Sequence, residues 1–122
     1  MTDRLAARLF PLDPGIRYVA VNQSGKITEM EQRAQWPSHN PPETDLMEEL
    51  IVNPIILDAT RRRGNLDLDG VAHVIIRYGK QYQAIFPFGE GHVSVGVELS
   101  ADVTEVANRV SEALAATAAP RP

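Results

Sequence analysis

The chain has 122 residues, no cysteine and a formal net charge of −4 at pH 7. The lack of cysteine excludes disulfides, cysteine nucleophiles and thiolate metal sites. The negative charge, with Lys26 and Lys80 as the only lysines, argues against nucleic-acid binding, which requires clustered basic residues. The sequence has an early acid, Asp3, and no apolar run of ~18 residues. We therefore expect neither a signal peptide nor a membrane span. We therefore expect a cytoplasmic protein.

The N-terminal third predicts a short helix followed by a hairpin. Thr2 to Phe10 is an amphipathic segment that Thr2 can cap. Strands are expected from Ile16 to Asn22 and from Lys26 to Arg33, joined by the turn Ser24-Gly25. The first strand is apolar enough to be central, whereas the charges of the second suit an edge of the sheet.

A proline-rich loop over residues 34 to 43 contains Trp36, the only tryptophan. Its side chain either caps the core or serves as a partner contact, because aromatic residues are enriched at interface hot spots. The loop predicts a break between the hairpin and the helical region that follows.

Helical spacing of apolar residues recurs after the loop, but Asn53-Pro54 interrupts it. Because proline fits the first turn of a helix and asparagine is a good cap, we expect two helical pieces, 44–52 and 54–63, with a kink or a break between them. Three arginines, 61 to 63, would complement the C-terminal end of the second piece, and Gly64 would close it in a left-handed conformation.

Three strands joined by short glycine-containing links are expected next: Val71–Tyr78, Gln81–Phe88 and His92–Leu99. A last helix follows to about Ala116, capped by Ser100 or Asp102. The sequence thus predicts an α+β fold, with a five-stranded antiparallel sheet, helices on its faces and the order α-β-β-α-β-β-β-α. We expect a single domain over residues 1–117 and a flexible tail over 118–122.

No catalytic motif is visible. His73 and His92 could share a face of the sheet, but no carboxylate or histidine spacing supports a metal site, and a hydrogen-bonded structural role is favoured. The adjacent pair Glu48 and Glu49 suits a helix start and has no apparent low-dielectric setting. We expect no catalytic residue, no cofactor, no metal and no enzyme activity.

The order of elements resembles the roadblock (dynein light chain) superfamily, whose fold is profilin-like. The resemblance rests on the strand and turn from Ile16 to Gly25 and on the closing meander from Val71 to Leu99, and it covers residues 2 to 116. It implies a non-enzymatic dimeric scaffold or regulatory module, with a homodimer and a small GTPase or other partner protein as partners. Two features depart from the family pattern: the interruption at Asn53-Pro54 and the long loop around Trp36.

In this family the first strand of the meander pairs with its counterpart and the central helices pack together. Carried to this chain, the resemblance assigns the dimer interface to Met47 and Ile51 on the helices and to one of two alternating sets on the strand, Val71, His73, Ile75 and Arg77 or Ala72, Val74, Ile76 and Tyr78. The apolar character of this strand agrees with a dimer interface, since an apolar strand left at an open edge is prone to unwanted pairing. The alternative is a PAS- or GAF-like small-molecule sensor, with a pocket lined by Trp36, Met47, Tyr82, Phe86 and Phe88.

Overall fold

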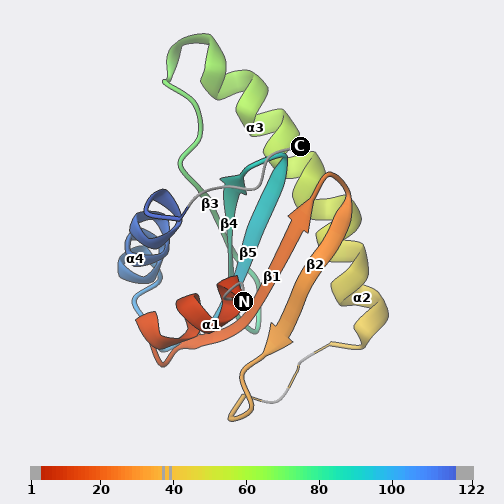
Figure 1. Cartoon of the computed structure of the whole chain (residues 1–122), viewed down its shortest axis with the longest axis vertical. Helices are drawn as coiled ribbons and strands as arrows, with labels where there is room; N and C mark the ends of the chain where they lie inside the picture. Colours follow the sequence, from red (N-terminus) through yellow and green to blue (C-terminus); the bar gives the residue numbers. More distant parts are fainter. Residues whose placement is uncertain (1–3, 37, 39, 118–122) are drawn as a thin grey trace.

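The structure, a computed structural model, describes residues 4–36, 38 and 40–117 (Figure 1). Thr2, His39 and the tail over 118–122 lie outside the described residues. The elements follow in the order α1 (Leu5–Leu9), η1 (Phe10–Leu12), β1 (Ile16–Gln23), β2 (Lys26–Gln32), α2 (Pro42–Met47), η2 (Glu48–Val52), α3 (Asn53–Asp67), β3 (Val74–Arg77), β4 (Tyr82–Phe88), β5 (Gly91–Val97) and α4 (Val103–Ala115).

The five strands form one antiparallel sheet in the order β2-β1-β5-β4-β3. This confirms the predicted fold class, with β1 inside the sheet and the charged β2 at an edge. The β4–β5 hairpin passes close to β1, and a Cβ at Gly91 would lie 1.8 Å from the carbonyl oxygen of Asn22. Only glycine fits this position, because the two backbones meet there.

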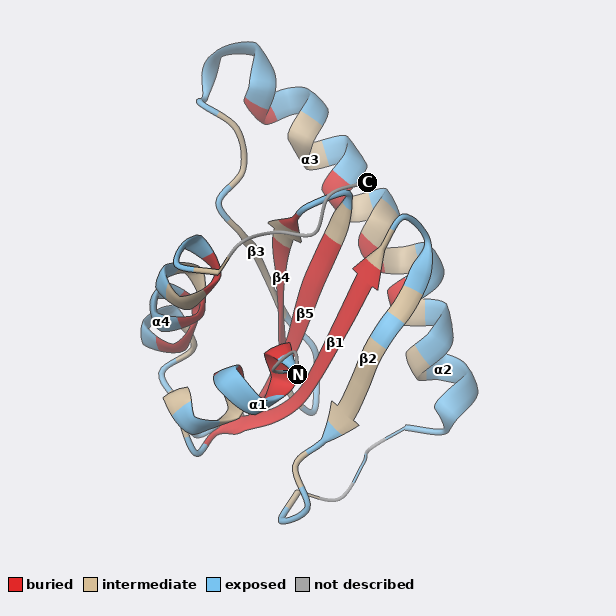
Figure 2. Ribbon diagram, viewed as in Figure 1, coloured by how far each residue is buried: buried red, intermediate tan, exposed pale blue. Residues whose placement is uncertain are grey.

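One face of the sheet carries the apolar core beneath α1 and α4 (Figure 2). Alternate residues of β1, β4 and β5 point into it, as the strand period requires. Capping of α1 comes from the sheet, because the carboxylate of Glu29 accepts the N–H groups of Leu5 and Ala6, each at 2.9 Å. At the other end of the core, Asp102 caps α4 by accepting the N–H of Glu105, as the sequence predicts.

The opposite face of the sheet is covered by one continuous helical stretch, α2, η2 and α3 (Figure 1). The helix is therefore not broken at Asn53-Pro54. The chain instead widens into the π-helical turn η2 just before the proline, and the N–H of Asn53 donates to the carbonyl of Glu48. A wide turn of this kind accommodates a residue that cannot donate a regular helical hydrogen bond.

Two further predicted boundaries need correction. The helix does not close at Gly64 but continues to Asp67, and the left-handed residues are Asp69 and Gly70. Gly64 instead allows the returning chain to approach, because a Cβ there would lie 2.6 Å from the carbonyl oxygen of Gly70. The first meander strand is also shorter than predicted, since residues 71 to 73 precede β3 without strand pairing.

Candidate interaction surface

The strand β3 forms an open edge of the sheet. One side of β3 pairs with β4, from Val74 opposite Ile85 to Arg77 opposite Tyr82, and no other described strand pairs with its second side. The other edge, β2, carries charged residues over most of its length, whereas β3 reads Val-Ile-Ile-Arg. An apolar strand with unpaired backbone groups is a template for another strand.

The side chains of β3 alternate between the two faces of the sheet. Ile75 packs against the apolar core beneath α1 and α4, and Arg77 lies over the ring of Tyr82 at 6.0 Å. Ile76 is paired with Gln83, whose amide reaches Ser94 on the face covered by α3. The set that includes Val74 and Ile76 therefore lies beside the helix, and the set that includes Ile75 and Arg77 lies on the core side.

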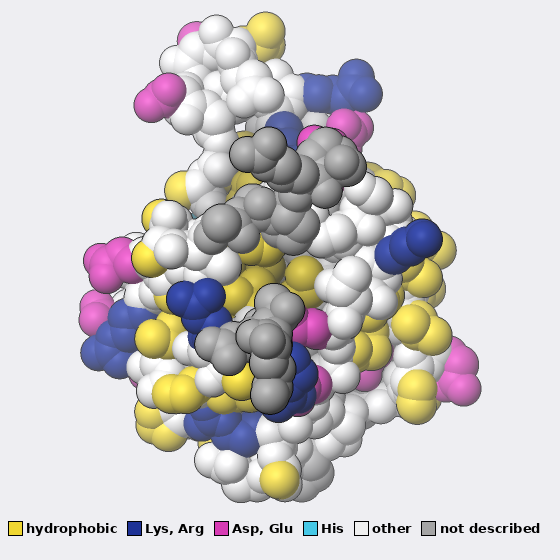
Figure 3. Space-filling view, in the orientation of Figure 1, with side chains coloured by type: hydrophobic (Ala, Val, Ile, Leu, Met, Phe, Trp, Pro, Cys, Tyr) yellow, Lys and Arg dark blue, Asp and Glu magenta, His cyan; other side chains and the backbone are white. Residues whose placement is uncertain are grey.

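Exposed apolar side chains continue this surface along the helical stretch. Met47, Ile51 and Ile55 are 50%, 54% and 64% exposed. The large exposed apolar residues among those described lie on the helical stretch, or directly after α3 and β3 in the case of Leu68 and Tyr78: Leu46, Met47, Leu50, Ile51, Ile55, Leu66, Leu68 and Tyr78. Figure 3 shows hydrophobic side chains exposed on the side of the molecule where α2 and α3 lie. Apolar side chains exposed along a helix make this surface a candidate interaction site.

A buried polar network fixes this helix on the sheet. The carboxylate of Glu49 is fully buried and accepts a hydrogen bond from the Tyr18 hydroxyl at 2.9 Å and one from the Asn53 amide at 3.2 Å. Nε2 of His92 lies 2.8 Å from the same carboxylate. Burial and the neighbouring Glu49 charge raise the pKa of the Tyr18 hydroxyl far above its usual range, so it stays a donor.

The network corrects two expectations from the sequence. Glu49 lies in a low-dielectric setting, which its position at a helix start did not reveal. His92 is a hydrogen-bonded structural residue, as predicted, but it does not share a face with His73, because His92 contacts Glu49 on the helix side whereas the ring of His73 lies 5.7 Å from Phe86 in the core. Among the described residues no cluster of histidine and carboxylate side chains could hold a metal ion.

The π-helical turn η2 is itself held by a side chain of the sheet. The carbonyl of Glu49 accepts the Asn22 amide at 3.0 Å. In the π-helical pattern its donor would be residue 54, but Pro54 has no N–H. Asn22 therefore replaces the missing backbone donor, which explains how the proline is tolerated within a continuous helix.

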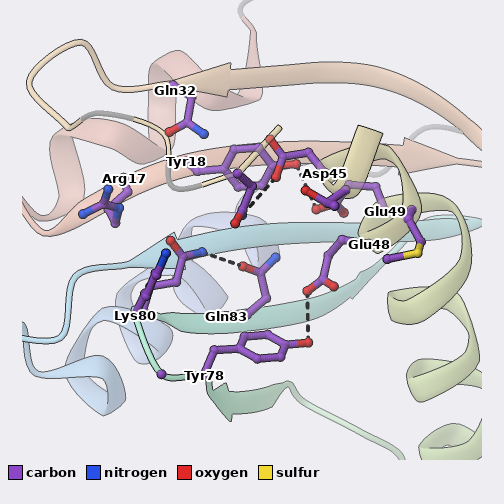
Figure 4. Close-up of a pocket in the computed structure, with 14 residues that line it drawn as sticks. Arg17, Tyr18, Gln32, Asp45, Glu48, Glu49, Tyr78, Lys80 and Gln83 are labelled. Carbon is purple, nitrogen blue, oxygen red and sulfur yellow. Dashed lines mark hydrogen bonds between the residues drawn. The ribbon is translucent and has the colours of Figure 1, made fainter. Parts of the chain in front are cut away.

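A cleft of about 290 Å³ opens beside η2, between the helical stretch and the ends of β1 and β4 (Figure 4). Glu48 lines it and accepts a 3.3 Å hydrogen bond from the Tyr78 hydroxyl. Burial, and then the charge of Glu49, raises the pKa of Glu48, and burial likewise raises the pKa of Asp45. The cleft thus holds carboxylates whose charged form is disfavoured by burial, and it is also lined by Arg17 and Lys80.

The residues proposed for a sensor pocket are not brought together. Phe86 and Phe88 fill the core beneath α1 and α4, while Met47 lines the cleft on the opposite face. Trp36 lies elsewhere again, donating to the carbonyl of Pro14 at 3.1 Å with the Arg17 guanidinium 5.1 Å from the centre of its ring. The aromatic pocket expected from the sequence is therefore not formed.

Comparison with known proteins supports the fold. No family model and no curated protein matches the sequence. Among solved structures, MglB with a tetrameric arrangement is 16% identical with a TM-score of 0.65, covering 90% of this chain and 82% of that one. The gliding protein MglB of Thermus thermophilus is 17% identical with the same TM-score and the same coverage.

A third solved structure, the roadblock/LC7 domain from Streptomyces avermitilis, is 14% identical with a TM-score of 0.65 and covers 93% of this chain and 94% of that one. No helix of the described residues is long and apolar enough to cross a membrane. The five-stranded antiparallel sheet with helices and the order of elements match the fold of these neighbours, and the chain has the roadblock fold.

Proposed function

We propose that this chain is a non-enzymatic binding module that works as a homodimer. The observation that carries the proposal is the open apolar edge of β3 beside the exposed apolar row on α2, η2 and α3. A second copy that pairs its own β3 with this edge extends the sheet and brings the two helical stretches together. Both exposed features are then covered by one contact, as an isologous two-fold interface requires.

The proposed interface contains the residues that the sequence indicated. On the strand side these are Val74 to Arg77 with the preceding Val71, Ala72 and His73, and on the helix side they are Met47 and Ile51. Backbone pairing involves the whole of β3. The helix-side set with Val74 and Ile76 adjoins the contact between helices. Trp36 has contacts within its own chain, so we place it outside this interface.

The dimer would act as a scaffold or regulator of another protein. The roadblock resemblance supports a small GTPase as the class of partner. Assembly of proteins with this fold is also supported by the neighbour described as MglB with a tetrameric arrangement. Titration of the dimer with purified small GTPases of the same organism, loaded with GDP or with a non-hydrolysable GTP analogue, tests this part. Equal and negligible binding of both forms would argue against a GTPase partner.

The first experiment is molar mass by light scattering. We expect a dimer for the wild type and a folded monomer for Ile55→Asp, because this side chain is 64% exposed and its substitution removes only surface contacts. Ile76→Lys tests the strand in the same way. Thr104→Asp on α4, at an exposed position on the other side of the sheet, is the matched control and should remain dimeric. A monomeric wild type would refute the homodimer.

A further inference from the structure

The two ends of β3 are flanked by opposite charges from the helical stretch. At the end of the strand, the Tyr78 hydroxyl donates to the carboxylate of Glu48. At its start, Arg63 lines a shallow hollow of about 360 Å³ together with Val74. Strand and helix run in opposite directions along each other, so an acid lies beside the last residues of β3 and an arginine beside the first.

Neither charge has a strong partner among the residues that the structure describes. Glu48 is half-buried, and none of the lysine and arginine side chains described lies within ion-pair distance of it. Burial, and then the charge of Glu49, raises the pKa of this carboxyl, so keeping it charged is costly. Within the described part of the chain, Arg63 pairs with Asp67 one helical turn away. The two side chains are 59% and 68% exposed, and such surface pairs contribute little.

Antiparallel pairing of two β3 strands about a two-fold axis exchanges their ends. The start of one strand then lies beside the end of the other, and the helices, which cover the same face, also run antiparallel. We propose that Glu48 of each protomer binds Arg63 of a second copy, so that two identical ion pairs form across the dimer. This inference rests on the proposed homodimer. It adds the relative orientation of the two protomers and the residues that favour pairing with an identical chain.

The contact is selective because the two charges of the proposed pair lie in opposite halves of one helical stretch. Glu48 lies in its first half and Arg63 in its second half, where Asp58 and Asp67 already pair with Arg62 and Arg63. An antiparallel arrangement places each half against its opposite, whereas a parallel arrangement would place like charges together. Charge complementarity of this kind governs the choice and orientation of partners.

The test is a charge exchange followed by analytical ultracentrifugation. Arg63→Glu brings two carboxylates together at both junctions and should raise the dimer dissociation constant about tenfold or more. The chain carrying both Glu48→Arg and Arg63→Glu keeps the wild-type net charge and should dimerise again, to within about threefold of the wild type. Mixed with wild type, this double variant should form few mixed dimers, because like charges would meet at both junctions.

Arg62→Glu is the matched control, since Arg62 carries the same charge one residue away, is 80% exposed and does not line the hollow beside β3. It should leave the dissociation constant within about twofold of the wild type, because an exposed charge outside the contact changes affinity little. Far-UV circular dichroism and thermal melting show that each variant is folded. Because Glu48 is half-buried, the exposed Arg63 carries the test if Glu48→Arg does not fold.

The outcomes separate this inference from the proposed function. A dimeric wild type that Arg63→Glu leaves unchanged would overturn the ion pair while the homodimer stands. Free mixing of the double variant with wild type would overturn the antiparallel arrangement. An equal effect of Arg62→Glu would show a general charge effect and would also count against the pair. A monomeric wild type would refute the proposed homodimer itself.

Discussion

Glu49 connects the helix to the sheet through its buried carboxylate. It accepts hydrogen bonds from Tyr18 and Asn53 and contacts His92, and none of these groups reaches solvent to replace a lost partner. Loss of one partner from a buried polar network of this kind leaves an unpaired donor or acceptor, which costs more than a hydrogen bond gains.

We therefore expect Glu49→Ala to lower the free energy of unfolding by about 3 kcal/mol or more, because three polar partners are left unpaired in the interior. Glu49→Gln, which keeps one carbonyl acceptor, should cost less. Urea denaturation followed by tryptophan fluorescence measures both. Glu48→Ala, one residue away and half-buried, is the control, and a loss for Glu49→Ala no larger than for this control would contradict the structural role of the network.

At the scale of elements, the continuous stretch of α2, η2 and α3 depends on a bond from the sheet. The Asn22 amide donates a hydrogen bond to the Glu49 carbonyl, to which Pro54 cannot donate because it has no N–H. The side-chain oxygen of Asn22 also accepts the N–H of Gly25 at 3.0 Å in the β1–β2 turn. One residue thus holds a hairpin turn and a helix on the same face, which makes the relative position of β1 and η2 well defined.

A double-mutant cycle tests this assignment. Asn22→Ala should lower the free energy of unfolding by about 2 kcal/mol, because it removes two hydrogen bonds. Pro54→Ala supplies a backbone N–H that can donate to the Glu49 carbonyl, so it should recover about 1 kcal/mol in the Asn22→Ala background. The turn contact with Gly25 stays lost, which limits the recovery. Additive effects of the two substitutions would argue against a shared carbonyl.

At the scale of the whole molecule, the proposed dimer places its axis near the middle of the helical stretch. Ile55 stands midway along the chain between Glu48 and Arg63, and the middle of β3 lies between Ile75 and Ile76. Residues close to a two-fold axis are the ones that meet their own counterparts. A disulfide requires Cα atoms about 4.4–6.8 Å apart, so it reports this proximity directly.

The chain has no cysteine, so a single introduced thiol is unambiguous. Ile55→Cys should form an intermolecular disulfide under mild oxidation, visible as a covalent dimer in non-reducing gel electrophoresis and reversed by reductant. Thr104→Cys on α4 is equally exposed to oxidant but distant from the axis, and it should remain a monomer on the gel. Cross-linking at Thr104 and none at Ile55 would place the contact on the wrong face of the sheet.

The sequence by itself determined the elements, their order and the architecture. Strand-like runs bounded by short turns, with clear alternation in β5, identified the strands. The charge of β2 placed it at an edge, and Asp102 was one of the two residues expected to cap α4. These are local signals, because strand period, edge charge and capping each involve residues close together in the chain. The apolar character of β3 likewise indicated an edge that a partner could cover.

Only the tertiary structure decided how the helix continues through Pro54 and that the carboxylate of Glu49 is the centre of a buried hydrogen-bond network. Both depend on contacts between residues far apart in the sequence, Asn22 with the Glu49 carbonyl and Tyr18 and His92 with its carboxylate. A proline normally indicates a break in a helix. Here the Asn22 amide, from another element, donates to the Glu49 carbonyl that lacks a backbone donor at Pro54. The proposed role of Glu48 and Arg63 also depends on the tertiary structure, because only folding places the two charges at opposite ends of one edge strand.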